Sequence, residues 1–246
     1  MKKSIQLLVC GAFLLSFAAK AQWSSNDKNK ISGNGNVVSQ TRTTADYDAV
    51  TVAGSFDVEL VSGKEGKITI KGEDNLLTAV KVEVVENVLK IYVEKGTNIR
   101  PSASKKIQIT VPFEKISEVS MAGSGDIQSK DAIKNDKFSA KLAGSGNFNL
   151  NVDSTDLELK LSGSGNMHLK GSSDSLITKL AGSGNIDTTN LKAKKVDANV
   201  SGSGNSRINC IESLTARIAG SGDIKYTGNP EKKDVKVSGS GSISKA

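Results

Sequence analysis

The tetrapeptide Gly-Ser-Gly-Asn, or a variant ending in Asp or Ser, recurs at nearly constant spacing through the second half of the chain. Consecutive copies begin 18 to 21 residues apart. So steady a period indicates one structural unit stacked on itself, because repeat proteins grow by adding equivalent units. The first glycines of the copies are Gly123, Gly144, Gly163, Gly182, Gly202, Gly220 and Gly239.

Apolar and polar residues alternate on both sides of each glycine pair. Residues 157–161 read Leu-Glu-Leu-Lys-Leu before a corner, and residues 148–152 read Phe-Asn-Leu-Asn-Val after one. A period of two is typical of a strand with one buried face. We therefore expect each unit to be strand, glycine corner, strand and polar turn. The apolar residues predicted to point inward include Leu159, Leu161, Leu180, Val200 and Ile218.

Many short strands at even spacing fit either a closed barrel or propeller, or a solenoid. In-register copies stack equivalent residues only when each turn of chain lies directly on the last, which favours the solenoid. The sequence therefore predicts an all-β fold, a parallel, right-handed β-helix (β-solenoid) with coils of about 19 residues.

The residue after each second glycine forms a polar column, which we name the corner ladder. Stacked about 4.8 Å apart, amide side chains can hydrogen-bond from coil to coil. The members of the corner ladder are Asp126, Asn147, Asn166, Asn185, Asn205 and Asp223, and Ser242 continues the column.

The start of the chain has the features of a signal peptide, predicted for residues 1–21. Lys2 and Lys3 precede a mostly apolar run, residues 4–18, and Ala19-Lys20-Ala21 fits a small-x-small cleavage site. We therefore expect an exported protein, in the periplasm, at the outer cell surface or outside the cell, with no transmembrane segment once the signal is removed. Lipidation at Cys10 is the less favoured alternative.

Three further regions follow the signal peptide. Residues 22–44 are polar and predicted to be a flexible leader. Residues 45–116 are strand-like without a clean period and are predicted to form irregular coils that cap the stack, since residues 53–58 (Ala-Gly-Ser-Phe-Asp-Val) look like a degraded corner. Residues 117–246 form the regular repeat. Cys210, the only cysteine left after signal removal, is predicted to be a buried apolar filler.

The order of segments in the mature chain resembles a known family. The segments are residues 47–52 (Tyr-Asp-Ala-Val-Thr-Val), 56–60 (Phe-Asp-Val-Glu-Leu), 68–72 (Ile-Thr-Ile-Lys-Gly), 88–91 (Val-Leu-Lys-Ile) and 109–112 (Ile-Thr-Val-Pro), followed by the repeated Gly-Ser-Gly-Asp/Asn. This order is similar to that of the auto-transporter adhesin head GIN domain family of Bacteroidetes-type bacteria, over about residues 45 to 246. The resemblance implies an exported β-helical domain with an adhesin-like role, and it assigns no catalytic residue.

Candidate catalytic and metal-binding residues are few. His168, the one histidine, is predicted to be a solvated strand residue, and the sequence has no nucleophile motif, phosphate loop or metal-spaced His/Cys cluster. The corners lack the nine-residue period of calcium-binding β-rolls, so calcium is a weak alternative and no cofactor is expected. A polysaccharide lyase or hydrolase remains the alternative to a non-enzymatic role, although aromatic residues, which stack sugars, make up only 4% of the chain.

One column of outward residues is a candidate ligand site, which we name the basic stripe. It comprises Lys141, Lys160, Lys179, Arg217 and Lys236, interrupted by Asn199. Glu158, Asp197 and Asp234 occupy a neighbouring outward column and offset part of its charge. A solvated face is the alternative interpretation. The stripe would suit an anionic glycan or another anionic envelope component.

Net charge argues against nucleic acid as the partner. Without Lys2, Lys3 and Lys20 the chain keeps 30 basic against 26 acidic residues, a small excess. The sequence therefore predicts a non-enzymatic, adhesin-like or scaffolding protein of the cell envelope and says nothing about its oligomeric state.

Overall fold

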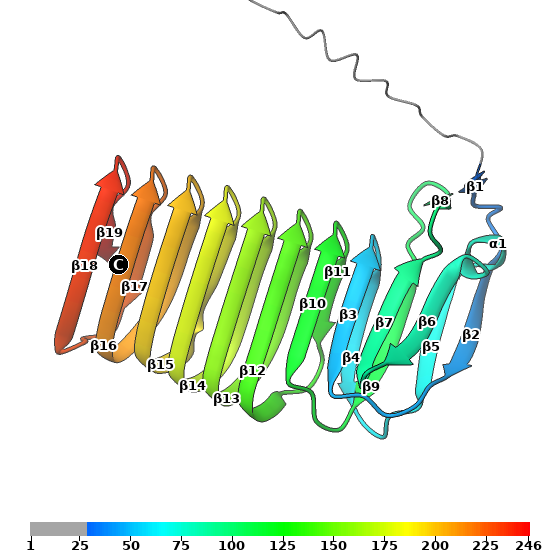
Figure 1. The fold of residues 1–246 in the computed structure, drawn as a ribbon, viewed down its shortest axis with the longest axis horizontal. Helices are drawn as coiled ribbons and strands as arrows, with labels where there is room; N and C mark the ends of the chain where they lie inside the picture. Colours follow the sequence, from blue (N-terminus) through cyan, green and yellow to red (C-terminus); the bar gives the residue numbers. More distant parts are fainter. Residues whose placement is uncertain (1–28) are drawn as a thin grey trace, which may run out of the picture.

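The computed structural model describes residues 29–246 and consists almost wholly of stacked strands (Figure 1). The predicted signal peptide, residues 1–21, lies outside the described residues. No helix in the described part is long and apolar enough to cross a bilayer.

The regular coils confirm the predicted β-solenoid. In each coil one strand segment runs to the glycine corner, forming what we call the front sheet, and the next segment returns behind it as the rear sheet (Figure 1). Neighbouring coils pair in parallel, and equivalent positions of the repeat lie side by side. Leu161 therefore lies beside Leu180, and Gly163 lies beside Gly182. The strands of these coils are β10 (Glu118–Gly123), β11 (Asp126–Ser129), β12 (Ile133–Gly144), β13 (Asn147–Gly163), β14 (Asn166–Gly182), β15 (Asn185–Gly202), β16 (Asn205–Gly220), β17 (Ile224–Thr227), β18 (Lys232–Gly239) and β19 (Ile243–Lys245).

The corners are tight because the coils touch there through their backbones. The carbonyl oxygen of Gly163 accepts hydrogen bonds from the amides of Ser183 (2.9 Å) and Gly184 (3.1 Å) of the next coil. Gly182 adopts φ +125°, a region that favours glycine. The glycines therefore allow both the bend and the close approach of successive coils.

The core lies between the two sheets and follows the predicted alternation. Leu159, Leu161, Leu180, Val200 and Ile218 are all buried, which confirms the predicted inward face. Burial of one such aliphatic side chain contributes about 1.5–3 kcal/mol. Cys210 is also buried, as predicted, and burial raises the pKa of its thiol.

The irregular first half is part of the same stack, but its coils do not follow chain order. Residues 53–58, which look like a degraded corner in the sequence, stack directly on the first regular corner: Gly54 pairs with Gly123 and Asp57 with Asp126. On the side of residues 49–62 that faces away from the regular coils, a later segment of the chain forms the next coil. There β3 pairs in parallel with β7, and β4 pairs in parallel with β9. The strands are β3 (Ala49–Gly54), β4 (Asp57–Ser62), β5 (Lys67–Glu73), β6 (Val80–Val85), β7 (Val88–Val93), β8 (Asn98–Arg100) and β9 (Gln108–Phe113).

The prediction of a flexible leader is wrong for residues 30–43. They form β1 (Lys30–Ser32), which pairs with β8, and β2 (Val37–Thr43), which pairs antiparallel with β5. Val38 and Arg42 lie on the more buried side of β2. Because β2 is an outermost strand, its side chains are mostly polar, and the apolar alternation that reveals a strand is missing.

The cap closes this end of the core with side chains from several segments. The short helix α1 (Asp74–Leu77) buries Leu76 and Leu77, and the Arg42 guanidinium donates hydrogen bonds to the carbonyls of Leu77 (2.9 Å) and Val80 (3.2 Å). Next to the helix, the Glu73 carboxylate accepts hydrogen bonds from the Ser102 hydroxyl (2.5 Å) and amide (2.8 Å), which lower its pKa. Two strands complete the cap: β5 pairs antiparallel with β9, and β6 pairs antiparallel with β7.

Candidate functional site

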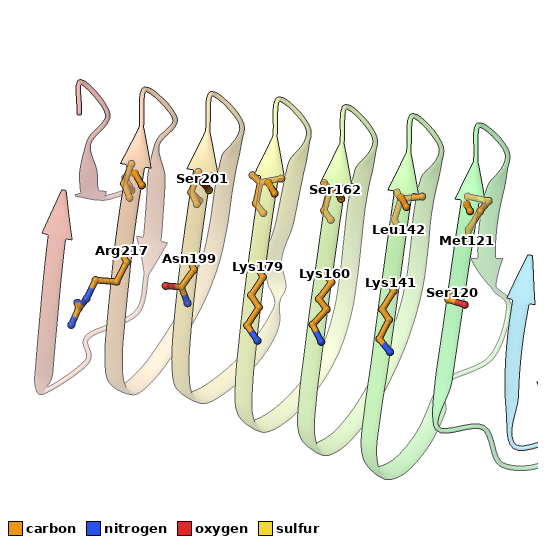
Figure 2. Close-up of a pocket in the computed structure, with 18 of the residues that line it drawn as sticks. Ser120, Met121, Lys141, Leu142, Lys160, Ser162, Lys179, Asn199, Ser201 and Arg217 are labelled. Atoms are coloured by element: carbon orange, nitrogen blue, oxygen red, sulfur yellow. The ribbon is translucent and has the colours of Figure 1, made fainter. Parts of the chain in front are cut away.

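A groove of about 790 Å³ crosses the front sheet at right angles to its strands. Equivalent residues from consecutive coils line it, and all members of the basic stripe are among them. Figure 2 labels Lys141, Lys160, Lys179 and Arg217. The sequence predicted that these side chains share one face, and the structure brings them into one column, through the pairs Lys141–Lys160, Lys160–Lys179 and Arg217–Lys236.

The floor of the groove is a second column, two residues nearer the corner. Its members are small because the chain must bend just beyond them, so the backbone lies near the surface there. They also line the groove, and the column comprises Ala122, Ala143, Ser162, Ala181, Ser201, Ala219 and Ser238. The groove is therefore bordered by the lysine side chains on one side and floored by alanine and serine.

The basic stripe is paired with carboxylates along most of its length. Lys141 Nζ lies 2.6 Å from Glu118 Oε2 of the preceding coil. Glu158 contacts both Lys160 (2.8 Å) and Lys179 (3.0 Å). Arg217 forms an ion pair with Asp234, and in Figure 2 its side chain reaches toward the neighbouring coil. Three carboxylates thus pair with four of the five basic side chains and offset part of the charge of the stripe.

Two members of the column stand apart from this pairing. Asn199 donates a hydrogen bond to Asp197 (2.8 Å), so the column has no cation on that coil. Lys236 makes no ion pair among residues 29–246.

The ion pairs also affect the protonation of Glu158. Hydrogen bonds from Lys160 and, to a smaller extent, from Lys179 lower the pKa of Glu158, so this carboxylate is held in its charged form.

The corner ladder forms a directional chain of hydrogen bonds along the solenoid. Each asparagine side-chain amide donates to the oxygen of the coil before it, with distances of 2.8 Å to 3.2 Å. Beyond Asn205 the chain continues through backbone amides: that of Asp223 donates to Asn205 (3.1 Å) and that of Ser242 to Asp223 (2.8 Å). The ladder lies at the surface, with its asparagines exposed or half-buried, so water also reaches these amides.

Comparison with known proteins places the chain in a family. A family model described as "Putative auto-transporter adhesin, head GIN domain" matches residues 46–230, three quarters of the sequence. The chain belongs to this family. No curated protein matches it.

Solved structures similar to this GIN domain are also bacterial. A putative adhesin from Bacteroides fragilis superposes with a TM-score of 0.79 at 22% identity, over 88% of this chain and 100% of its own. A putative adhesin from Parabacteroides merdae gives 0.72 at 22% identity, over 89% and 99%. A putative lipid binding protein from Parabacteroides distasonis gives 0.71 at 28% identity, over 89% and 100%. The two adhesins, below 25% identity, support the fold alone.

The side chain of His168 lies beside the corner ladder, in the same hollow as Asn166 and Asn185. His168 is exposed on β14, as predicted, and pairs in register with Asp187 on β15. Arg207 Nη1 lies 3.8 Å from Asp187, in a hollow of about 370 Å³ beside the ladder. Within the described residues no three His, Cys, Asp or Glu side chains cluster as a metal site requires. A glycosidase acid needs a raised pKa, whereas that of Glu158 is lowered.

The sequence reasoning missed two features of the groove. Glu118 was not recognised as a partner of Lys141, because this contact depends on the direction of a flexible lysine side chain on the next coil. The second is the column of small floor residues, which the repeat pattern places just before each corner. The available signal was the alternation itself, since a residue two positions after a stripe lysine must share its face.

Proposed function

We propose that this GIN domain is a non-enzymatic, exported protein of the cell envelope that binds an extended ligand along the groove of the front sheet. The observation that carries the proposal is the repetition of the groove, in which consecutive coils present nearly the same set of side chains. Adjacent strands are about 4.8 Å apart, so the same contacts recur at that interval. Such a surface suits a polymer better than a compact small molecule. The family's adhesin description and the signal-like residues 1–21 support an exported binding role.

The ligand we propose is an anionic glycan of the envelope. Five basic side chains border the groove, and a polymer carrying repeated carboxylate, sulfate or phosphate groups would meet several of them at once. Each contact is weak because the side chains are exposed and four of the five are paired with carboxylates, so affinity must come from many simultaneous contacts. A polysaccharide lyase or hydrolase is not favoured, since Glu118, Glu158 and Asp234, the carboxylates next to the basic stripe, are engaged in ion pairs.

The test uses the double variant Lys160→Gln/Lys179→Gln and two polymers with the same backbone, dextran sulfate and dextran. We expect the parent protein to bind dextran sulfate in the micromolar range or more weakly, with affinity that falls steeply as salt rises, and to ignore dextran. The double variant should bind dextran sulfate less well without a lower melting temperature, because both side chains face outward. Isothermal titration or surface plasmon resonance measures the binding.

Equal binding of the parent and the double variant at low salt would contradict this assignment of the groove. Vesicles of phosphatidylcholine with and without phosphatidylglycerol form a separate arm, motivated by the lipid binding description of the Parabacteroides distasonis neighbour. Groove-dependent binding to the anionic vesicles but not to dextran sulfate would replace the glycan with a lipid surface.

A further inference from the structure

Glu158 lies beside the groove and, among residues 29–246, is the one carboxylate that pairs with two members of the basic stripe. Its Oε2 atom lies 2.8 Å from Lys160 Nζ on the same strand, and its Oε1 atom lies 3.0 Å from Lys179 Nζ on the next coil. Both oxygens are therefore occupied by ammonium groups. The side chain of Glu158 is 30% exposed, and those of the lysines are 42% and 53% exposed, so all three are accessible from solvent.

The pairing draws both ammonium groups away from the floor of the groove. Lys160 and Lys179 extend along their strands away from the glycine corner (Figure 2). Glu158 lies two residues before Lys160, whereas the floor residue Ser162 lies two residues after it, on the side of the corner. An anion lying on the floor must therefore draw the two lysines off Glu158.

We propose that Glu158 acts as a built-in competitor of the ligand and sets how densely charged a polymer must be to bind. This inference rests on the proposed function of the groove. When a ligand anion takes the two ammonium groups, Glu158 is left to water, and the lost ion pairs are subtracted from the binding free energy. A polymer with closely spaced strong anions overcomes this competition. A neutral polymer, or one with sparse charges, does not.

Two other glutamates of the chain provide a graded comparison. Glu118 holds only Lys141, through one contact of 2.6 Å. Glu86 lies in the turn between β6 and β7, within the cap and away from the groove. The three positions therefore hold two, one and none of the stripe lysines, while each contributes the same formal charge.

The experiment compares Glu158→Gln, Glu118→Gln and Glu86→Gln with the parent for binding to dextran sulfate, dextran and polygalacturonate. Exposed ion pairs are weak, so release of two lysines is expected to raise the affinity for dextran sulfate by between about twofold and thirtyfold. Glu118→Gln should give a smaller gain and Glu86→Gln none. The gain should shrink at high salt, and polygalacturonate should gain as well.

An affinity of Glu158→Gln equal to or below that of the parent would overturn the inference, since Glu158 would then be neutral or would position the lysines for binding. An equal gain in Glu86→Gln would also overturn it, because net charge alone would explain the effect. Two other outcomes would contradict the proposed function of the groove itself. In the first, Lys160→Gln/Lys179→Gln binds dextran sulfate as well as the parent. In the second, neither the parent nor Glu158→Gln binds any of the polymers, and either outcome would also overturn the inference.

Discussion

At the scale of single residues, two positions of each corner require glycine, whereas the serine between them can be replaced. A Cβ atom at Gly182 would lie 2.3 Å from the carbonyl oxygen of Gly163, and one at Gly184 would lie 2.2 Å from that of Gly165. Both distances are far inside van der Waals contact. Ser183 lies between them, is exposed, and contributes its backbone amide to the coil before it.

Replacement of Gly182 by alanine is therefore expected to destabilise the solenoid. The substitution combines an unfavourable φ of +125° with contact against backbone that cannot move without separating two coils. Strain of this kind costs about 1–3 kcal/mol, and the separation of the coils adds to it. Thermal and urea unfolding measure the loss. The matched control is Ser183→Ala, which should change stability little, and similar stability of the two variants would contradict the corner geometry.

At the scale of one structural element, the corner ladder is a surface feature that fastens neighbouring coils. Its hydrogen bonds run between side chains that water can reach, so each replaces a bond to solvent and its net contribution is small. The inward columns differ, because Leu161 is buried and water cannot replace the packing contacts that its side chain makes. The ladder therefore aligns the coils, and the apolar columns hold them together.

Replacement of Asn166 by alanine tests this division. It removes one donated and one accepted side-chain hydrogen bond, to Asn147 and from Asn185, and is expected to cost about 0.5–1.5 kcal/mol. Leu161→Ala should cost about 2–5 kcal/mol, since it opens a cavity in the core. Unfolding curves compare the two variants with Ser164→Ala at the exposed corner. A cost for Asn166→Ala as large as that of Leu161→Ala would mean that the ladder is shielded from water.

At the scale of the whole molecule, the two ends of the stack are finished differently. The cap buries Leu76 and Leu77 and uses Arg42 to satisfy backbone carbonyls. At the other end β18 is exposed along its length, and its inward valines, Val235 and Val237, remain 50% and 40% exposed. Because each coil of a solenoid contacts only its neighbours, stability should vary along the axis.

Amide hydrogen exchange should reveal this gradient. We expect the amides of β17, β18 and β19 to exchange fastest and those of β13, β14 and β15 slowest, because the middle coils have a buried neighbour on each side. Exchange followed by mass spectrometry of peptides measures the order. The internal reference is the cap, where β5 and β9 should be protected despite their irregular sequence. Uniform protection from end to end would indicate that the solenoid opens as one unit.

The regular half of the molecule could be predicted from sequence because its information is local and repeated. Strict alternation assigns Leu159 to the core and Lys160 to the surface, and the constant period stacks Leu161 on Leu180. The same logic located the basic stripe. It could not show that Glu158 holds both Lys160 and Lys179, because that depends on the directions of flexible side chains on neighbouring coils.

The irregular half shows what only the tertiary structure decided. Residues 53–58 revealed their corner by likeness to the repeat, but the sequence has no sign that β7 and β9 form the coil outside β3 and β4. Nor does it show that β2, β5 and β6 close the stack with antiparallel pairs. Strand pairing over long distances depends on which faces remain to be buried after the coils assemble. The register of a repeat follows from its own alternation of apolar and polar residues. The arrangement of the cap depends instead on the apolar surface that the last coil leaves exposed.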